Sequence, residues 1–483
     1  MPYRTPTVRE GLSREALRQL EARLGKKAVL SSAADLKLYE YDGGVDKSLP
    51  DAVVFPRSTE EVAAVLRIAC EHNLPIAGRG SGTGLSGGAI ARAGGILISF
   101  ARMNRILEID IENERAVVQP GVVNLDITLA VQPFGYFYAP DPSSQRACTI
   151  GGNVAENAGG PHTLAYGVTT NHVTALEAVL PDGTIIELGG KEPDVPGYDL
   201  LGLLTGSEGT MALTTKIAVR LMRRPEAVKT MLAIYNTTDE AGDTVGEITA
   251  AGIVPAAIEM LDGPMLRMVE AATQAGYPMD AAAVLLIEME GLSEAVEEQA
   301  ARIAGICNRC GARQVRVAQS EAERNLLWKG RKNAFGAIGR VRPTYYVQDG
   351  VVPRTQIART LRAIEEIGRK YEIPISNVFH AGDGNMHPIL PFDPRTPGDL
   401  ERAQKAGEEI LDFCISVGGS ITGEHGIGME KMELMAHLFT DDTLNLIRRF
   451  KNLFDPSCRL NPGKVLPTGK GCLEIRQRPE LVL

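Results

Sequence analysis

Hydrophobic and polar positions along the chain follow two periods, and together they predict a mixed fold. The apolar run at 52–55 predicts a strand, and the run at 75–78 predicts another. Between them, Ser58 and Glu61 have the spacing of a capping box at the start of a helix. The apolar face of that helix consists of Val62, Val65, Leu66 and Ala69. This order predicts a strand–helix–strand unit near the beginning of the chain.

Two predicted hairpins follow this unit. Apolar runs at 106–111 and 116–119 flank one polar turn, and runs at 174–180 and 184–188 flank another. A further strand is predicted at 94–100. Helical crossovers combined with antiparallel ribbons are typical of the α+β class.

The character of the chain changes near residue 225, where glycine becomes sparser and longer helical patterns begin. We therefore expect a domain boundary there and a second domain made of a sheet covered by helices. The predicted helices are 293–311, 320–340, 354–371 and 400–417, and the predicted strands are 284–289, 314–318 and 375–379.

The chain is thus expected to divide into four parts. Residues 1–45 form an N-terminal helical segment with an amphipathic pattern at 13–24. Residues 46–225 form a glycine-rich domain, 226–467 form the helix-rich domain, and 468–483 form a tail.

Charge and cysteine content narrow the class of protein. The net charge of −9 argues against a nucleic-acid-binding surface. The seven cysteines are scattered and odd in number, which argues against a disulfide framework and fits a reducing compartment. Cys307 and Cys310 form an isolated CxxC at the end of a predicted helix; we interpret it as structural, against a weaker redox or zinc alternative.

The pattern of apolar runs bears on location. The N-terminus has no hydrophobic signal core, and the longest fully apolar run, 281–287, is too short to cross a bilayer. We therefore expect a soluble, cytoplasmic protein, and peripheral attachment at the inner membrane through a partner stays open.

Three glycine-rich segments fall within one predicted domain, at 78–88, 149–160 and 206–210. Loops of this kind expose many backbone N–H groups and can wrap a pyrophosphate. The spacing Gly82-x-Gly84-x-x-Gly87 formally matches a dinucleotide-binding fingerprint, and Glu108 or Asp110 lies near the expected acidic position. That fingerprint requires a helix directly after the glycines, whereas 94–100 has the pattern of a strand. The three segments together predict a large, extended cofactor.

Histidines and one carboxylate gather near the C-terminal end. His380 and His387 lie seven apart across an Asp-Gly-Asn turn, and Glu424-His425 follows inside a glycine cluster. Two imidazoles and a carboxylate can hold a divalent metal with positions left for substrate. His425 is then available for proton transfer. The alternative is that His380 and His387 are ordinary buried or turn residues.

Several motifs resemble the FAD-binding family of vanillyl-alcohol oxidase and p-cresol methylhydroxylase. Within that family the chain is similar to the FAD-linked subunits of bacterial glycolate oxidases, and to D-lactate and D-2-hydroxyglutarate dehydrogenases. The resemblance extends from about residue 40 to about 467. The motifs are GRGSGTGLSGG, TIGGNVAENAGG, GSEGT, LWKGRKNAF, FHAGDGNMHP, GEHGIG and the closing Asn461-Pro-Gly-Lys464.

This resemblance implies a two-part FAD-binding domain of the p-cresol methylhydroxylase type with a C-terminal α+β cap. Non-covalent FAD is expected, because the first glycine segment has no attachment residue, although His162 lies near the second. The residues implied to bind FAD are Gly78, Arg79, Gly80, Ser81, Gly82, Thr83, Gly84, Asp141, Ser143, Ser144, Gly151, Gly152, Asn153, Asn157, Gly159, Gly160, Gly209 and Asn461.

The resemblance also implies roles around the substrate. Positions matching His380, His387 and Glu424 hold a zinc-like ion, the match to His425 acts as base, and the match to Arg331 binds the substrate carboxylate. A solvated Arg331 is the alternative from its helical position alone. The lysine that binds a distal carboxylate in the 2-hydroxyglutarate enzymes is missing near 345–349, which favours glycolate or D-lactate. Met211-Ala212 replaces the usual Leu-Gly after the third glycine segment and is expected to affect packing behind the flavin.

The implied reaction is oxidation of a small D-2-hydroxy acid to the 2-keto acid. Electrons would pass to partner subunits with iron–sulfur clusters and then to quinone. The alternatives are an oxygen-reducing flavin alcohol oxidase, a D-2-hydroxyglutarate-type dehydrogenase, and a flavin- or metal-binding subunit that is inactive alone. A homo-oligomer is left open.

Overall fold

The computed structural model describes residues 11–191 and 196–467, and the tail expected at 468–483 lies outside the described residues. The described chain forms two compact units. The first combines 11–159, 168–191, 196–224 and 424–467, and the second combines 160–167 and 225–423. The expected boundary near 225 coincides with the start of the long segment of the second unit. Residues 424–467, which were expected in the second domain, belong to the first unit instead.

The first sheet of the first unit has the order β1 (Val29–Leu30), β2 (Ala52–Val54), β4 (Ile96–Ser99) and β3 (Ile76–Arg79). Strands β2 and β3 both pair with β4 in parallel, as expected of a strand–helix–strand unit. Helix α3 (Thr59–Glu71) buries the predicted face of Val62, Val65, Leu66 and Ala69, and α1 (Arg14–Leu24) packs on it, which confirms both helices.

The predicted capping box of α3 is only half formed. The Glu61 N–H donates to Ser58 Oγ, but the Glu61 carboxylate accepts from the N–H of Arg57, one residue before the N-cap. The predicted hydrogen bond from the Ser58 N–H to the Glu61 carboxylate was therefore wrong, although the helix begins where the pattern indicated.

The second sheet of the first unit contains both predicted hairpins. Its order is β5 (Ile106–Asp110), β6 (Arg115–Val118), β10 (Leu213–Arg220), β8 (Val173–Val179) and β9 (Ile185–Gly189), with antiparallel neighbours throughout. The predicted strand 94–100 is present as β4. The small pair β7 (Tyr136–Phe137) and β11 (Met222–Arg223) is separate.

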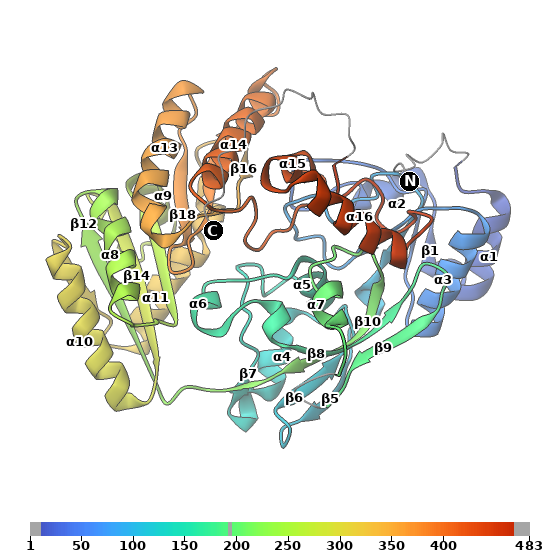
Figure 1. Cartoon of the computed structure of the whole chain (residues 1–483), viewed down its shortest axis with the longest axis horizontal. Helices are drawn as coiled ribbons and strands as arrows, with labels where there is room; N and C mark the ends of the chain where they lie inside the picture. The colour runs from blue at the N-terminus through green and yellow to red at the C-terminus, as the bar shows by residue number, and fades with distance from the viewer. Residues whose placement is uncertain (1–10, 192–195, 468–483) are drawn as a thin grey trace. The chain divides into compact units, whose positions relative to one another are not determined.

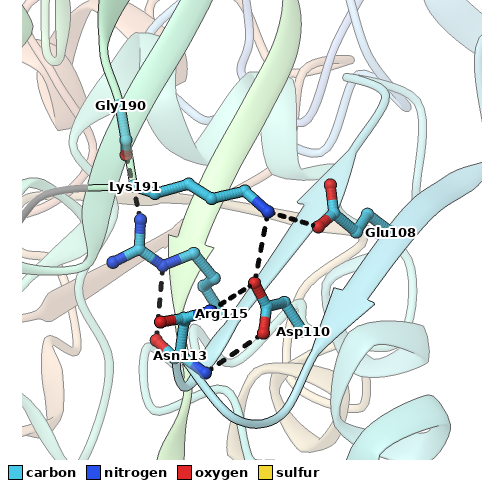
Figure 2. Close-up of polar contacts among 6 residues, drawn as sticks. All are labelled: Glu108, Asp110, Asn113, Arg115, Gly190 and Lys191. Atoms are coloured by element: carbon cyan, nitrogen blue, oxygen red, sulfur yellow. Dashed lines mark hydrogen bonds and ion pairs between the residues drawn. The ribbon is translucent and has the colours of Figure 1, made fainter.

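The two edge strands of this five-stranded sheet approach each other at one end (Figure 2). Lys191, just after β9, donates to Glu108 at 2.9 Å and to Asp110 at 3.3 Å on β5, and Arg115 Nη1 donates to the Gly190 carbonyl at 3.0 Å. The sheet is therefore strongly curled. Because Glu108 and Asp110 serve these contacts, they do not support the dinucleotide-fingerprint interpretation.

The second unit is built on one large sheet and is shown with its helices in Figure 1. The strand order is β15 (Gln314–Val317), β12 (Ala227–Tyr235), β14 (Ala283–Gly291), β13 (Ala257–Asp262), β18 (Ser376–His380), β19 (Asn385–Met386) and β17 (Gly350–Val351). Strand β20 (Pro388–Phe392) pairs with β16 (Thr344–Val347) and with β18.

Helices cover this sheet as expected. The predicted helices are present as α10 (Ser293–Arg309), α13 (Ile357–Lys370) and α14 (Asp399–Ser416). The helix expected over 320–340 is instead two helices, α11 (Glu321–Lys332) and α12 (Ala334–Ile338), separated at Asn333. Helices α8 (Thr238–Ala250), α9 (Gly263–Thr273) and α6 (Thr163–Tyr166) also belong to this unit.

Candidate functional site

A cavity in the first unit brings the three glycine-rich segments together. It lies between the end of β3, the short helix α5 (Ile150–Glu156), the turn before β10 and the start of β10 itself. Its lining residues are Gly78, Arg79, Gly80, Gly88, Ala89, Phe100, Pro120, Thr149, Gly151, Gly152, Ala155, Glu156, Leu204, Ser207, Glu208, Gly209, Ala212, Leu213 and Thr214.

Close approach of the segments explains two of these glycines. A Cβ atom on Gly80 would lie 2.1 Å from Thr149 Oγ1, and one on Gly151 would lie 2.5 Å from Pro120 Cβ. Real Cβ atoms do not come this close to other atoms, so a side chain at Gly80 would force the first and second segments apart, and one at Gly151 would force the second segment away from Pro120. Glycine is thus needed at both positions for the close approach in this part of the cavity lining.

Two buried polar atoms belong to residues that line the cavity. Thr149 Oγ1 and Glu156 Oε2 are buried and have no hydrogen-bond partner among the described residues. A buried polar atom without a partner costs free energy, so a bound group that bonds to it is stabilised. The donor and acceptor set and the glycine-lined walls fit a polar, extended cofactor such as FAD.

Ionisable groups behind the wall have shifted pKa values. Burial raises the pKa of Glu156, and the nearby Glu208 carboxylate raises it further. Burial also raises the pKa of Glu208, although the N–H groups of Ile427 and Gly428 each donate to it at 2.6 Å and oppose the rise. Burial lowers the pKa of Lys464 to about 7. Two acids of the cavity lining and the nearby Lys464 therefore have pKa values shifted toward neutral pH.

The predicted FAD residues are only partly among the cavity-lining ones. Gly78, Arg79, Gly80, Gly151, Gly152 and Gly209 line the cavity, whereas Gly160 belongs to the second unit. For the residues that do not line it, contact with FAD stays a prediction. These are Ser81, Gly82, Thr83, Gly84, Asp141, Ser143, Ser144, Asn153, Asn157, Gly159 and Asn461.

Two of the predicted asparagines hold the protein framework. Asn461 Nδ2 donates to the Gly88 carbonyl at 3.1 Å and the Glu208 carbonyl at 2.7 Å, which ties the first and third glycine segments together. Asn153 Oδ1 accepts from Asn124 Nδ2 at 2.9 Å. Both side chains are buried, and each is held in part by these bonds to the protein.

Sequence reasoning missed other lining residues. Thr149, Ser207 and Glu208 lie inside the quoted motifs, and the motifs were a sufficient signal for them. Phe100, Leu204 and Leu213 are apolar residues of strands or helices, and no local pattern marks them as cavity walls. Ala212, expected to affect packing behind the flavin, lines the cavity itself.

A second polar cluster lies in the second unit around Glu259. This carboxylate is fully buried on β13. Its Oε1 is 2.6 Å from His380 Nδ1, and its Oε2 accepts from Arg331 Nε at 2.5 Å. Glu259 and His380 are direct cross-strand partners of β13 and β18, so the strand register places them side by side.

Arg331 is 1% exposed on the last turn of α11, so the solvated alternative is wrong. Its Nε is used by Glu259, while Nη1 and Nη2 are buried with no hydrogen-bond partner among the described residues. A buried guanidinium whose two Nη groups have no partner can bind a planar anion such as a carboxylate.

The two histidines of the Asp-Gly-Asn turn lie together in this unit. Their ring centroids are 5.1 Å apart at 81°, and both are 2% exposed. His387 Nε2 is 3.5 Å from Asp349 Oδ1, and the other oxygen of Asp349 accepts from the Gly423 N–H at 3.1 Å and from the Thr422 hydroxyl. The pair is thus buried and backed by carboxylates, as metal-binding histidines generally are.

Glu424 and His425 belong to the first unit, where they begin its last segment directly after Gly423. His425 Nε2 lies 3.8 Å from Glu424 Oε1. The predicted ligand Glu424 and the predicted base His425 are therefore assigned to a different unit from His380 and His387, and their common site stays a prediction.

Another histidine–carboxylate group, His162, Glu288 and Glu290, lies in the second unit. Glu288 already accepts from Trp328 Nε1 at 2.6 Å, from Arg324 Nε at 3.1 Å and from the Thr230 hydroxyl, and it lies 3.3 Å from His162 Nε2. This carboxylate is occupied by protein donors, which favours a structural anchor over a metal site. Glu288 through His162, and Glu290 through the Tyr166 hydroxyl that donates to it at 2.6 Å, fasten segment 160–167 to strand β14.

Comparison with known proteins supplies the family. The family described as FAD binding domain matches residues 50–189, and the family described as FAD linked oxidases, C-terminal domain, matches residues 224–465. The chain is 46% identical over 448 residues to the glycolate oxidase subunit GlcD of Escherichia coli strain K12, which covers 92% of this chain and 90% of that protein.

Two further proteins extend the comparison. A D-lactate dehydrogenase of Archaeoglobus fulgidus is 36% identical over 420 residues, covering 86% of this chain and 91% of that protein. The crystal structure of p-cresol methylhydroxylase with substrate bound has a TM-score of 0.78 at 18% identity, covering 93% of this chain and 96% of that chain. This likeness confirms the expected fold class.

Proposed function

Because the chain belongs to the family of FAD linked oxidases, we propose that it oxidises a small D-2-hydroxy acid, glycolate or D-lactate, to the 2-keto acid with FAD as cofactor. The observation that carries this proposal is Arg331, whose two buried Nη groups have no partner among the described residues. Its Nε donates to Glu259, the carboxylate that also contacts His380.

Arg331 selects the class of substrate. A 2-hydroxy acid offers a planar carboxylate that can accept from both Nη groups at once, which fixes the direction of the α-carbon. A substrate without a carboxylate would leave the buried donors unsatisfied and would be rejected strongly. This favours a hydroxy acid over a simple alcohol or sugar.

His380 and His387 fit a divalent ion, and Glu424 is the proposed third ligand. The Glu259 carboxylate accepts from His380 Nδ1, so the lone pair of a neutral His380 lies on Nε2, the nitrogen that would ligate a metal. A zinc-like ion held there supplies Lewis acidity at the α-hydroxyl. His425 is the proposed acceptor of the hydroxyl proton.

The reaction breaks the O–H and α-C–H bonds and forms the C=O bond. His425 takes the proton, Arg331 holds the carboxylate, and His380 and His387 orient the hydroxyl side of the substrate. FAD, when bound by the glycine-lined cavity, supplies the acceptor for the α-hydrogen and its electron pair. FAD binding is proposed to be non-covalent.

Aromatic rings near the histidines favour a short substrate. The Phe335 ring centroid lies 6.5 Å from that of His387 and 6.2 Å from that of Tyr345. Rings of this kind pack against a hydrogen or a methyl group at the α-carbon and offer no charge to a distal carboxylate. Glycolate and D-lactate are therefore preferred over D-2-hydroxyglutarate.

The electron acceptor is proposed to be a partner. GlcD of E. coli is named as a subunit, and by analogy this chain would pass electrons to iron–sulfur partner subunits and quinone. No helix in the described ranges combines the length and the apolar character that membrane crossing requires. A cytoplasmic location, with any membrane attachment through partners, stays a prediction.

Steady-state turnover with a soluble quinone analogue tests this function. We expect glyoxylate from glycolate and pyruvate from D-lactate, with L-lactate and D-2-hydroxyglutarate much slower. Faster turnover with oxygen than with quinone, on an alcohol that lacks a carboxylate, would favour the alcohol oxidase alternative. Efficient turnover of D-2-hydroxyglutarate would instead correct the substrate.

A further inference from the structure

We infer that Glu259 is a positioning residue that couples the carboxylate-binding arginine to the metal-binding histidine. The inference rests on the function proposed above and adds a residue that no motif in the chain marks. Each oxygen of Glu259 serves one partner: Oε1 serves His380 Nδ1 at 2.6 Å, and Oε2 serves Arg331 Nε at 2.5 Å.

The chemistry of a carboxylate fixes both partners. An ionised carboxylate only accepts hydrogen bonds, so a neutral His380 must carry its proton on Nδ1 and keep its lone pair on Nε2. By engaging only Nε of Arg331, the same carboxylate leaves the Nη groups for the substrate. One buried side chain thereby sets the chemistry of two proposed ligand positions.

The backbone places Glu259, His380 and Arg331 next to one another in the interior of the second unit. Register pairs Glu259 directly with His380 across β13 and β18. Gly330 lets α11 approach closely, because a Cβ atom there would lie 2.3 Å from Tyr277 Cε2, and the Tyr277 hydroxyl donates to the Leu327 carbonyl at 2.7 Å. Arg331 is thereby carried down to the Glu259 carboxylate.

Charge explains why the coupling matters. A buried guanidinium without an anion is strongly unfavourable, and Glu259 supplies that anion before substrate arrives. Without it, Arg331 would move toward water or toward another acid, and His380 would be able to present either nitrogen. Both the carboxylate site and the metal site should then lose affinity together.

The competing explanation is that Glu259 only stabilises the fold. A variant of Glu288 provides a matched control for this explanation. Glu288 is equally buried on the neighbouring strand β14 and contacts a histidine, an arginine and a tryptophan. Among the described residues its hydrogen-bond and ion-pair partners are His162, Thr230, Arg324 and Trp328. Glu288→Gln therefore reports the cost of removing a buried carboxylate from this sheet outside the proposed site.

The experiment compares Glu259→Gln and Glu288→Gln as full-length FAD-loaded proteins. Zinc affinity is measured by competition with a chelator, and KM and kcat are measured for glycolate. We expect Glu259→Gln to keep its FAD, to lose about 10- to 100-fold in zinc affinity, and to raise KM for glycolate. Glu288→Gln should change zinc affinity and KM by less than about twofold.

The other results contradict either the inference or the proposed function on which it rests. Wild-type zinc affinity and KM in Glu259→Gln, or equal losses in Glu288→Gln, would show that Glu259 is only structural. If Glu259→Gln does not fold, Glu259→Asp is used, because its shorter side chain cannot reach both partners and should show the same paired loss. A wild type that oxidises glycolate without holding zinc overturns the coupling but leaves the proposed function intact. A wild type that binds zinc but oxidises no 2-hydroxy acid overturns the proposed function instead.

Discussion

Arg331 is the residue on which substrate recognition depends most. It is buried, one of its nitrogens is held by Glu259, and the other two are directed to the substrate in the proposed function. Lysine at this position could replace the charge but not the planar fork. A conservative change should therefore have a large effect on catalysis.

We predict that Arg331→Lys lowers kcat/KM for glycolate about 30- to 1,000-fold. This corresponds to a loss of transition-state stabilisation on the order of 2–4 kcal/mol. The matched control is Arg340→Lys, since Arg340 is exposed and its Nη1 donates to the Ala271 carbonyl at 2.7 Å. Steady-state kinetics of both variants measure the effect. Equal efficiencies for wild type and Arg331→Lys would remove Arg331 from the substrate site.

Variants of His425 and His380 are predicted to lose activity for different reasons. His425→Ala should keep FAD and metal but slow flavin reduction by about 100- to 10,000-fold, as expected on removing a general base. His380→Ala should lose metal, and activity should fall with it. Metal analysis and anaerobic flavin reduction separate the two, with His437→Ala as an exposed control. If His425→Ala loses metal while His380→Ala keeps it, the assigned roles are reversed.

At this scale, sequence patterns predicted the residues that lie in motifs and missed those that act through tertiary contacts. His380, His387 and Arg331 were found because they lie in recognisable segments. Glu259 lies within the apolar strand 257–262, and only the presence of a charge between buried neighbours distinguishes it. Its partners come from β18 and α11, so no local pattern could identify them.

At the scale of elements, the glycine segments form the cavity by close approach. We predict that Gly80→Ala lowers FAD affinity at least about tenfold, because its Cβ would overlap Thr149 in the cavity wall. Gly246→Ala, in α8 and outside the cavity, is the control, since its Cβ meets no atom within 4 Å. FAD titration of the apoproteins measures the difference. Equal affinities for the two variants would show that the close approach at Gly80 is not needed.

Strand β14 and segment 160–167 are joined by Glu288. Burial alone would raise the pKa of Glu288, but hydrogen bonding and charge from His162, with Arg324 and Thr230, hold it at about 2. Because the folded pKa lies below the unfolded value, the group stabilises the folded unit above pH 4.5, and this contribution is lost as pH falls toward 2.

The ionised Glu288 carboxylate is predicted to contribute about 3 kcal/mol to the free energy of unfolding. Urea unfolding followed by the fluorescence of Trp328, the single tryptophan and a donor to Glu288, reports on the second unit. Wild-type stability should fall between about pH 5 and pH 3 more steeply than that of Glu288→Gln. Parallel pH profiles would show that Glu288 does not carry the dependence.

Local patterns predicted most elements but not where they are interrupted. Strand alternation and helical periodicity gave both hairpins and the helices α10, α13 and α14 within a few residues. The break at Asn333 was missed because the residues on either side continue the helical periodicity. There the Asn333 side chain donates to the Lys329 carbonyl at 2.7 Å, a bond that competes with continuation of the helix.

For the whole molecule, the boundary near 225 was visible as a change in glycine content, whereas the return of 424–467 to the first unit was not. The return depends on tertiary contacts such as the hydrogen bonds from Asn461 to the Gly88 and Glu208 carbonyls and from Lys451 to Thr210. No local pattern indicates which unit these residues will join.

The whole molecule is proposed to transfer electrons from a D-2-hydroxy acid to bound FAD with the help of a metal. Flavin absorbance reports this transfer when the FAD-loaded, zinc-replete protein is mixed anaerobically with glycolate, D-lactate or L-lactate. We predict rapid bleaching by glycolate and D-lactate, slow bleaching by L-lactate, loss of the fast phase after chelation and its recovery with zinc. Flavin that stays oxidised with all three acids in zinc-replete protein would contradict the proposed function.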